Sequence, residues 1–391
     1  MKASSLLTST LQKDIIGFAR DLIRIKSYSS QEEEAIKFVE QKMKALGYDE
    51  VHIDAMGNVV GRIGFGKKIL MFDSHVDTVE VNDEQEWDFP PFNGDIVNGR
   101  IHGRGSVDMK SSLAASVYAA AIGKKMELIK KDLSVYVSCT VNEEDCDGEN
   151  LKHLFTELDL RPDYMVICEP SNNTIAIGHK GKAQIKIRTK GISAHGATPE
   201  KGVNAIYEMA EIIQRVEKTN ESLGCYNDRK GSLVLSKIFS ISASLNAVPT
   251  ECEIYLDRRL VPGESIDTVR QEMDRIVEGK NANWGIGTLL RKSWTGLDIS
   301  YAPVHAPWNI GLGHDLIKLC AKAYLETFRK EPDKFEFWDF STNAVTPVSM
   351  GIPTIGFGPG DYKLAHMRNE SCDVQQILDA CSFYIRVNCN M

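Results

Sequence analysis

Residue types that bind transition metals recur beyond the ends of the apolar runs of this sequence, and one more stands just before a predicted helix. A histidine flanked by carboxylates is the ligand chemistry of zinc, cobalt or manganese rather than of calcium. Such a site activates water for hydrolysis. The residues in question are His75 and Asp77 in ILMFDSHVD, Asp108 in GRGSVDMKSS, Glu143 and Glu144 in VYVSCTVNEE, Glu169 in YMVICEP, and His366 in PTIGFGPGDYKLAH.

The spacing within two of these motifs indicates a division of roles. His75 and Asp77 share a face in extended chain, so Asp77 can accept the second ring N–H of His75 and set its tautomer. Glu143 and Glu144 would point in opposite directions in extended chain. One can then bind metal while its neighbour acts as the general base toward the attacking water.

Each of these residues also has an ordinary structural interpretation. A lone histidine after a strand is usually a satisfied core residue, a Glu-Glu pair is usually solvated, and an Asp before a helix is usually its N-cap. The metal hypothesis gains weight because all of the apolar runs would end at one edge of one sheet. Ligands bind at the carboxyl ends of strands in open α/β sheets.

Apolar periodicity predicts the elements that would position these side chains. Strand patterns alternate with helical ones in the first part of the chain and return in the last part, which favours an α/β layer with a largely parallel sheet. Helices are expected at residues 14–25, 32–46, 111–122, 312–328 and 374–387, and strands at 68–72, 133–141, 164–168 and 353–357.

The middle of the chain follows a different pattern. Residues 183–189, 233–240 and 250–256 alternate apolar and polar side chains, and residues 203–216 and 266–277 read as amphipathic helices. A sheet with one wet face and two helices is an α+β layer. We therefore expect a catalytic domain of residues 1–177 and 295–391, interrupted by an inserted domain of residues 178–294.

Composition excludes several classes of function. The chain has 391 residues, a formal net charge of -8 and no long basic run, which argues against nucleic acid as a partner. Its longest apolar stretch, residues 113–122, is too short to cross a membrane. The segment MKASSLLTSTLQKD lacks a signal-peptide core, and the nine cysteines form no C-x-x-C pair, so we expect a protein of the reducing cytoplasm.

The chain resembles the acetylornithine deacetylase / succinyl-diaminopimelate desuccinylase family of dinuclear zinc metallopeptidases over nearly its whole length. Within that family it is most similar to the selenium-metabolism hydrolase subgroup, through VHIDAMGNVVGRIG, EEDCDG, KSWTGL and DFSTNAV. The family likeness rests on SHVDTV, GRGSVDMK, NEEDCDG, ICEPS, GISAHGATPEKGVNAI, GIPTIGFGPG and AHMRNE, which occur in family order.

The resemblance implies two divalent metal ions, of which Zn²⁺ is expected and Co²⁺ or Mn²⁺ are alternatives. It assigns His75 and Glu169 to one ion and Glu144 and His366 to the other. Asp108 bridges the two ions ahead of a cis peptide to Met109.

The remaining implied roles concern the base and the inserted domain. Glu143 is the general base and Asp77 orients His75. The inserted domain resembles an α+β, ferredoxin-like lid that forms a homodimer. In many members the residue that matches His195 reaches the partner subunit's site, and the residues that match Asn246 and Arg258 contact the substrate carboxylate.

The resemblance leaves the substrate open. Arg368 stands where the family commonly has proline, and DFSTNAV replaces a common Ser-Gly-Gly-Thr-Asp segment. An acetyl, succinyl, carbamoyl or aminoacyl group on a small amino acid, or a short peptide, all fit. The competing class is a non-catalytic small-molecule or peptide binding protein that retains the fold, but such a protein needs no general base at Glu143.

Overall fold

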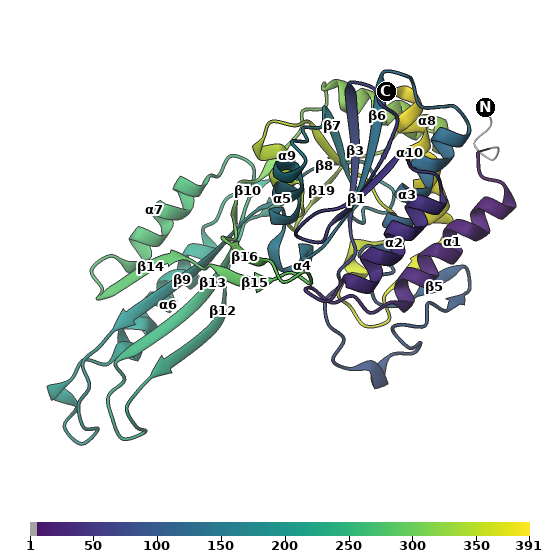
Figure 1. The fold of residues 1–391 in the computed structure, drawn as a ribbon. Helices are drawn as coiled ribbons and strands as arrows, with labels where there is room; N and C mark the ends of the chain where they lie inside the picture. Colours follow the sequence, from purple (N-terminus) through teal and green to yellow (C-terminus); the bar gives the residue numbers. More distant parts are fainter. Residues whose placement is uncertain (1–5) are drawn as a thin grey trace.

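A computed structural model describes residues 6–391, which form two lobes (Figure 1). The N-terminal residues 1–5, part of the segment in which no signal-peptide core is expected, lie outside the described residues. Among the described residues, no helix combines the length and the apolar character needed to span a bilayer.

The larger lobe is built on a mixed sheet whose central strands are parallel. Strands β6, β3, β7 and β20 lie side by side in parallel register, which confirms the expected largely parallel sheet. The order is β1 (Glu50–Ile53), β2 (Val59–Ile63), β6 (Leu133–Thr140), β3 (Lys68–His75), β7 (Tyr164–Ile167), β20 (Thr354–Gly356), β8 (Ala176–His179) and β18 (Trp308–Asn309), with β19 (Glu336–Trp338) also paired to β8.

Helices cover both faces of this sheet, as expected for an α/β layer (Figure 1). Alternate residues of β3 belong to different core clusters, with Phe72 in one and Met71 in the other, because successive side chains of a strand point to opposite faces. The first face packs against α1 (Ser9–Arg24), α2 (Glu33–Ala45), α3 (Lys110–Lys125), α8 (Asp315–Phe328) and α10 (Val374–Asn390), and the second against α5 (Glu149–Glu157) and α9 (Val345–Ser349).

The smaller lobe has the βαββαβ order of a ferredoxin-like domain, which confirms the predicted α+β insertion. Its helices pack their apolar faces on one side of an antiparallel sheet. In chain order the elements are β9 (Gly181–Lys190), α6 (Ala205–Glu221), β12 (Ser232–Ile241), β13 (Glu251–Leu260), α7 (Ile266–Val277) and β14 (Ala282–Ile286), and the sheet order is β12-β13-β9-β14.

After β14 the chain passes between the two lobes more than once before it rejoins the larger sheet. The hairpin of β15 (Leu289–Lys292) and β16 (Asp298–Tyr301) packs residues such as Trp294 against the core of the larger lobe. β17 (Val304–His305) then pairs with β9 of the smaller sheet before β18 joins the larger one. The domain boundaries at residues 177 and 294 stay a prediction, and the second of them falls inside this hairpin.

Candidate metal centre

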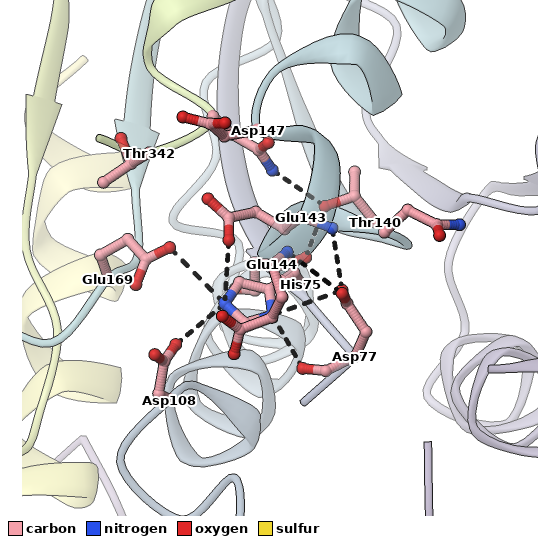
Figure 2. Close-up of polar contacts among 12 residues, drawn as sticks. His75, Asp77, Asp108, Thr140, Glu143, Glu144, Asp147, Glu169 and Thr342 are labelled. Carbon is pink, nitrogen blue, oxygen red and sulfur yellow. Dashed lines mark hydrogen bonds and ion pairs between the residues drawn. The ribbon is translucent and has the colours of Figure 1, made fainter. Parts of the chain in front are cut away.

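Four of the predicted ligands lie close together near the carboxyl ends of the central parallel strands, and Figure 2 labels them: His75, Asp108, Glu144 and Glu169. His75 is the last residue of β3, Glu169 follows β7, and His366 follows η4 (Tyr362–Leu364) on the chain beyond β20. All of the expected metal ligands except His75 line one cavity of about 260 Å³; they are Asp108, Glu144, Glu169 and His366, and Glu143 lines it as well.

The local conformation at Glu143 and Glu144 differs from the expectation. The two residues are not in extended chain but begin the short helix α4 (Glu143–Cys146). Asn142 turns the chain out of β6 in the left-handed region, with φ 54°. Both carboxylates line the same cavity, Glu143 near His75 and Glu144 near His366, and they are placed by a helix start that follows a tight turn and not by strand alternation.

Asp108 lies between the two histidines. Its Oδ1 is 2.9 Å from His75 Nε2, and its Oδ2 is 3.2 Å from His366 Nε2. The peptide bond from Asp108 to Met109 is cis. One carboxylate oxygen thus faces each histidine, which is the arrangement that a carboxylate shared by two metal ions requires.

Each histidine has carboxylates of its own. His75 Nε2 lies 3.6 Å from Glu169 Oε1 and 3.9 Å from Glu143 Oε2. His366 Nε2 lies 2.9 Å from Glu144 Oε2. The side chains therefore divide into one group around His75 and another around His366, joined by Asp108.

Asp77 lies beside His75 and supports this arrangement (Figure 2). The nearest acceptor to His75 Nδ1 is the backbone carbonyl of Asp77 at 2.9 Å, whereas the Asp77 carboxylate is 3.5 Å away. Since a carbonyl only accepts, Nδ1 carries the proton and Nε2 is left to bind a cation. The Asp77 carboxylate instead accepts from the backbone N–H of Glu143 at 3.1 Å and of Glu144 at 3.2 Å.

The electrostatics of the site favour a bound cation. Burial raises the pKa of Glu143 well above its usual range and that of Glu144 to about 7. Hydrogen bonds to Asp108 and Glu144 raise the pKa of His366 to about 10. Burial opposes protonation of His75, but the nearby Asp108 carboxylate and its other acidic neighbours raise its pKa well above the usual value. These groups hold protons that divalent ions would displace on binding.

The donor set suits divalent metal ions. Ligand atoms of His75, Glu143 and Glu169 lie within 4.8 Å of one another, as do those of His75, Asp108 and Glu144. Imidazole nitrogens with carboxylate oxygens suit zinc, cobalt or manganese.

Glu370 is a supporting residue to which the sequence analysis gave no role. It is fully buried, and its Oε1 accepts from the backbone N–H of Val107 at 2.8 Å and of Asp108 at 3.1 Å. Arg104 Nη1 donates to its other oxygen at 2.7 Å. The residue was visible in AHMRNE, but nothing in the sequence pairs it with a loop more than two hundred residues away.

Two cations of the smaller lobe face the cavity. Lys182 and Arg259 line it beside the acidic groups. Lys182 Nζ lies 3.1 Å from Asp147 Oδ1, and Arg259 Nε donates to Asp257 Oδ1 at 2.7 Å. Each of these cations therefore pairs with a carboxylate of the protein while it lines the wall that the smaller lobe supplies.

The structure does not bring Arg258 to the cavity. Its side chain is fully buried in the smaller lobe, where Nη2 pairs with Glu264 at 2.7 Å and with Glu272 at 2.9 Å. The reason is strand alternation: on β13, Arg258 and Arg259 point to opposite faces. The arginine on the cavity side is Arg259, one residue after the position expected.

His195 and Asn246 also lie away from the cavity. Both are exposed on the smaller lobe, and neither lines the cavity in this single chain. They are neighbours across paired loops, since the N–H of Gly196 donates to the carbonyl of Asn246 at 2.6 Å and His195 bridges to Ala247. A role at a catalytic site therefore needs either lobe closure or a second subunit.

Comparison with known proteins agrees with this architecture. Residues 71–389 match peptidase family M20/M25/M40. The chain is 35% identical over 383 residues to uncharacterized protein YgeY of Escherichia coli (strain K12), covering 96% of this chain and 94% of that protein. It is 30% identical over 266 residues to acetylornithine deacetylase of Vibrio atlanticus (strain LGP32), covering 66% of this chain and 69% of that enzyme.

Solved structures share the fold at lower identity. A tripeptidase from Staphylococcus aureus superposes with a TM-score of 0.75 at 20% identity, covering 97% of this chain and 98% of that one. The YXEP protein of Bacillus subtilis, described as a dinuclear metal binding peptidase from the M20 family, superposes with a TM-score of 0.71 at 13% identity, covering 98% of each chain.

Proposed function

The chain belongs to peptidase family M20/M25/M40, a family of metal-dependent hydrolases that cleave amide bonds, and we propose that its substrate is an N-acyl, N-carbamoyl or aminoacyl amino acid. The observation that carries this proposal is Asp108, whose two oxygens face His75 at 2.9 Å and His366 at 3.2 Å. Such a carboxylate suits a pair of ions in a cavity that also holds a candidate base.

The residues would hold the two ions as follows. His75 and Glu169 would hold one ion, Glu144 and His366 would hold the other, and Asp108 would contribute one oxygen to each. Two divalent ions would polarise the substrate carbonyl and make a water molecule acidic enough to attack it. Zn²⁺ is the proposed resident metal, and Co²⁺ or Mn²⁺ suit the same nitrogen and oxygen donors.

Glu143 is the proposed general base. Its carboxylate lines the cavity, 3.9 Å from His75 Nε2, where it can take a proton from the attacking water. It then returns that proton to the leaving nitrogen. Asp77 contributes by holding the backbone of Glu143 and by keeping the Nδ1 proton on His75.

The cavity wall supports a substrate with a carboxylate. Because the protein carries a net charge of -8, its overall field repels anions, and local cations must attract them. Arg259 and Lys182 are the cations of the smaller lobe that line the cavity. We assign Arg259, in place of Arg258, as the group that binds the substrate carboxylate, because a guanidinium can donate two parallel hydrogen bonds to it.

The roles proposed for His195 and Asn246 depend on a homodimer. Strand β12 is the edge of the smaller sheet and exposes Val234, Ile238 and Ile241, a surface that pairing with a second copy would cover. In such a dimer His195 would reach the partner subunit's site and stabilise the oxyanion that develops at the attacked carbonyl, while Asn246 would contact the substrate.

A complementation experiment tests this shared site. His195→Ala and Glu143→Ala variants, each nearly inactive alone, are mixed and allowed to exchange subunits. A hybrid dimer then has one site with both groups intact and recovers part of the activity. If subunit exchange is complete by mass and activity does not return, His195 does not act in trans.

The proposed reaction is tested by a substrate screen with a matched variant. Zinc- and cobalt-loaded protein is assayed on N-acetyl, N-succinyl and N-carbamoyl amino acids and on dipeptides. Glu143→Gln should lower turnover by roughly 10²–10⁴ while the metal content is unchanged. Loss of metal in this variant would exchange the roles of Glu143 and Glu144. If metal-loaded wild-type protein binds these compounds without cleaving any of them, the chain is instead a binding protein that has kept the fold.

We place this enzyme in the cytoplasm. Its nine cysteines are all free, and most are buried, which suits a reducing compartment. Nucleic acid and membranes are not proposed as partners.

A further inference from the structure

A second cluster of metal-binding side chains lies outside the catalytic cavity, where the turn after β1 meets α5. His153 and Glu157 are one helical turn apart on α5 and present their side chains to the same side. Asp54 is the first residue after β1, and His52 lies within that strand. Two imidazoles and two carboxylates therefore meet at a place that the hydrolytic reaction does not use.

The distances in this cluster suit a shared ion better than direct hydrogen bonds. His153 Nδ1 lies 3.5 Å from Asp54 Oδ2 and 3.8 Å from Glu157 Oε2. Hydrogen bonds to nitrogen are shorter, at about 2.7–3.2 Å. Ligands that are each about 2.1 Å from a tetrahedral zinc ion lie about 3.4 Å from one another. The ligand atoms of these three residues lie within 4.8 Å of one another.

His153 Nδ1 is itself without a partner. The atom is buried and makes no hydrogen bond with any other group in residues 6–391. A buried polar atom that lacks a partner is costly, and an ion or water that occupies the space beside it removes that cost. The atom faces two carboxylates, so a cation beside it would meet one imidazole nitrogen and two carboxylate oxygens.

Asp54 has the capacity to bind an ion in addition to its structural role. Its Oδ1 accepts from the backbone N–H of Gly57 and of Asn58, both at 2.8 Å, and its Oδ2 accepts from Asn58 Nδ2 at 2.7 Å. A carboxylate offers about four lone pairs. The three hydrogen bonds leave one lone pair of the buried Oδ2 unused. This oxygen is the one nearest His153 Nδ1.

The Glu157 carboxylate is also held in position by its neighbours. The backbone N–H of Ala55 donates to its Oε2 at 2.9 Å, and this bond lowers the pKa of Glu157, so the carboxylate is ionised. His52 Nε2 lies 3.1 Å from its other oxygen. Outer partners of this kind orient metal-binding carboxylates.

The cluster is open to solution and separate from the catalytic centre. His153 and Glu157 line a cavity of about 460 Å³ that shares no lining residue with the catalytic cavity. We propose that Asp54, His153 and Glu157 bind one divalent ion of the zinc class, with water completing its coordination from this cavity.

Hydrogen bonds connect the proposed ion site to the segment that precedes Glu143 and Glu144. Asn58, whose N–H and side chain bind Asp54, also accepts from the N–H of Val141 at 3.0 Å and donates to the carbonyl of Asn150 at 3.2 Å. Val141 lies just before the turn that carries Glu143. An ion that binds only the folded chain at this junction also stabilises it against unfolding.

Metal content tests the proposal. Wild-type protein and the variants Glu157→Gln, His153→Gln and Glu149→Gln are dialysed against the same buffered free Zn²⁺, and bound zinc per chain is measured. Glu149 lines the same cavity and pairs with Lys152, so its variant is the control for loss of a carboxylate from α5. Asp54 is left intact because it also holds its own turn.

The expected result is one zinc ion fewer per chain in Glu157→Gln and His153→Gln than in wild type and Glu149→Gln. Loss of a residue that only hydrogen-bonds a metal ligand weakens metal binding by about 10–100-fold. Loss of a ligand itself should weaken zinc binding by more than that. Added zinc should also raise the melting temperature of both variants less than it raises that of wild type and Glu149→Gln. Equal zinc content in all four proteins would overturn the proposal. The test compares bound zinc per chain between variants. The expected difference of one ion therefore does not depend on how much zinc the catalytic centre holds.

Discussion

Replacing Asp77 with asparagine tests whether this one carboxylate positions both the proposed base, Glu143, and the proposed metal ligand, Glu144. Asp77 is fully buried, and its carboxylate accepts from the N–H of Glu143, the N–H of Glu144 and the hydroxyl of Ser29, the last at 2.8 Å. Its two oxygens face the two amides separately. Asparagine keeps one oxygen and presents an NH₂ group in the place of the other.

The expected cost follows from that geometry. In either orientation of the introduced side-chain amide, at least one of the two backbone N–H groups loses its acceptor and faces a donor. A buried donor without a partner costs about 1–3 kcal/mol, and the charge-assisted bonds that remain are weakened. Because these amides position the start of α4, we expect metal affinity to fall by about 10–100-fold, as on loss of other outer partners.

The assay is competition for zinc with a chelator of known affinity, together with turnover at saturating metal. Ser29→Ala is the matched control, because it removes one bond to the same carboxylate and leaves both backbone bonds intact; it should cost about 1 kcal/mol of stability and little metal affinity. If Asp77→Asn binds zinc as tightly as wild type and keeps its turnover, the carboxylate does not position Glu143 and Glu144, and the reasoning fails.

Three further predictions follow from individual contacts. Arg258→Met should lower the free energy of unfolding in urea by about 3–5 kcal/mol, because it leaves Glu264 and Glu272 unpaired, whereas Arg259→Ala should leave stability nearly unchanged and lower kcat/KM. Burial lowers the pKa of His179 from 6.5 to about 4, so its contribution is complete above pH 6.5 and is lost as pH falls toward 4. The unfolding free energy of wild type should therefore drop relative to His179→Leu by about 3 kcal/mol between pH 7 and pH 4, and parallel pH profiles would contradict this. Gly358→Ala would place Cβ 2.4 Å from the carbonyl oxygen of Cys168 and 2.5 Å from that of Glu169, so it should destabilise the protein and weaken zinc binding, as measured by melting and by chelator competition.

The arrangement of the catalytic layer was predictable because it depends on periodicity. The helix expected at residues 374–387 is observed as Val374–Asn390, and the strand expected from residue 133 is observed as Leu133–Thr140. Metal-binding residue types at the ends of parallel strands must meet at one sheet edge. The order of apolar runs and polar residues therefore predicted that His75 and Glu169 lie close together.

The orientation of particular side chains was not predictable in this way. Strand β13 continues to Leu260, beyond the expected end at residue 256, so the faces of Arg258 and Arg259 were not assigned. Because side chains alternate with a period of two, an error of one residue exchanges the cavity for the core. The conformation of Glu143 likewise depends on Asp77, which lies beyond the end of another strand.

Contacts between distant segments were decided by the tertiary structure alone. The sequence determined which residues could bind metal and which strands would carry them, because ligand chemistry and apolar spacing are local properties. It did not indicate that Glu370 holds the backbone of Asp108, or that Asp54 meets His153 and Glu157 across about a hundred residues. Those meetings depend on how helices and turns pack against the sheet, and packing is set by the shapes of many side chains at once.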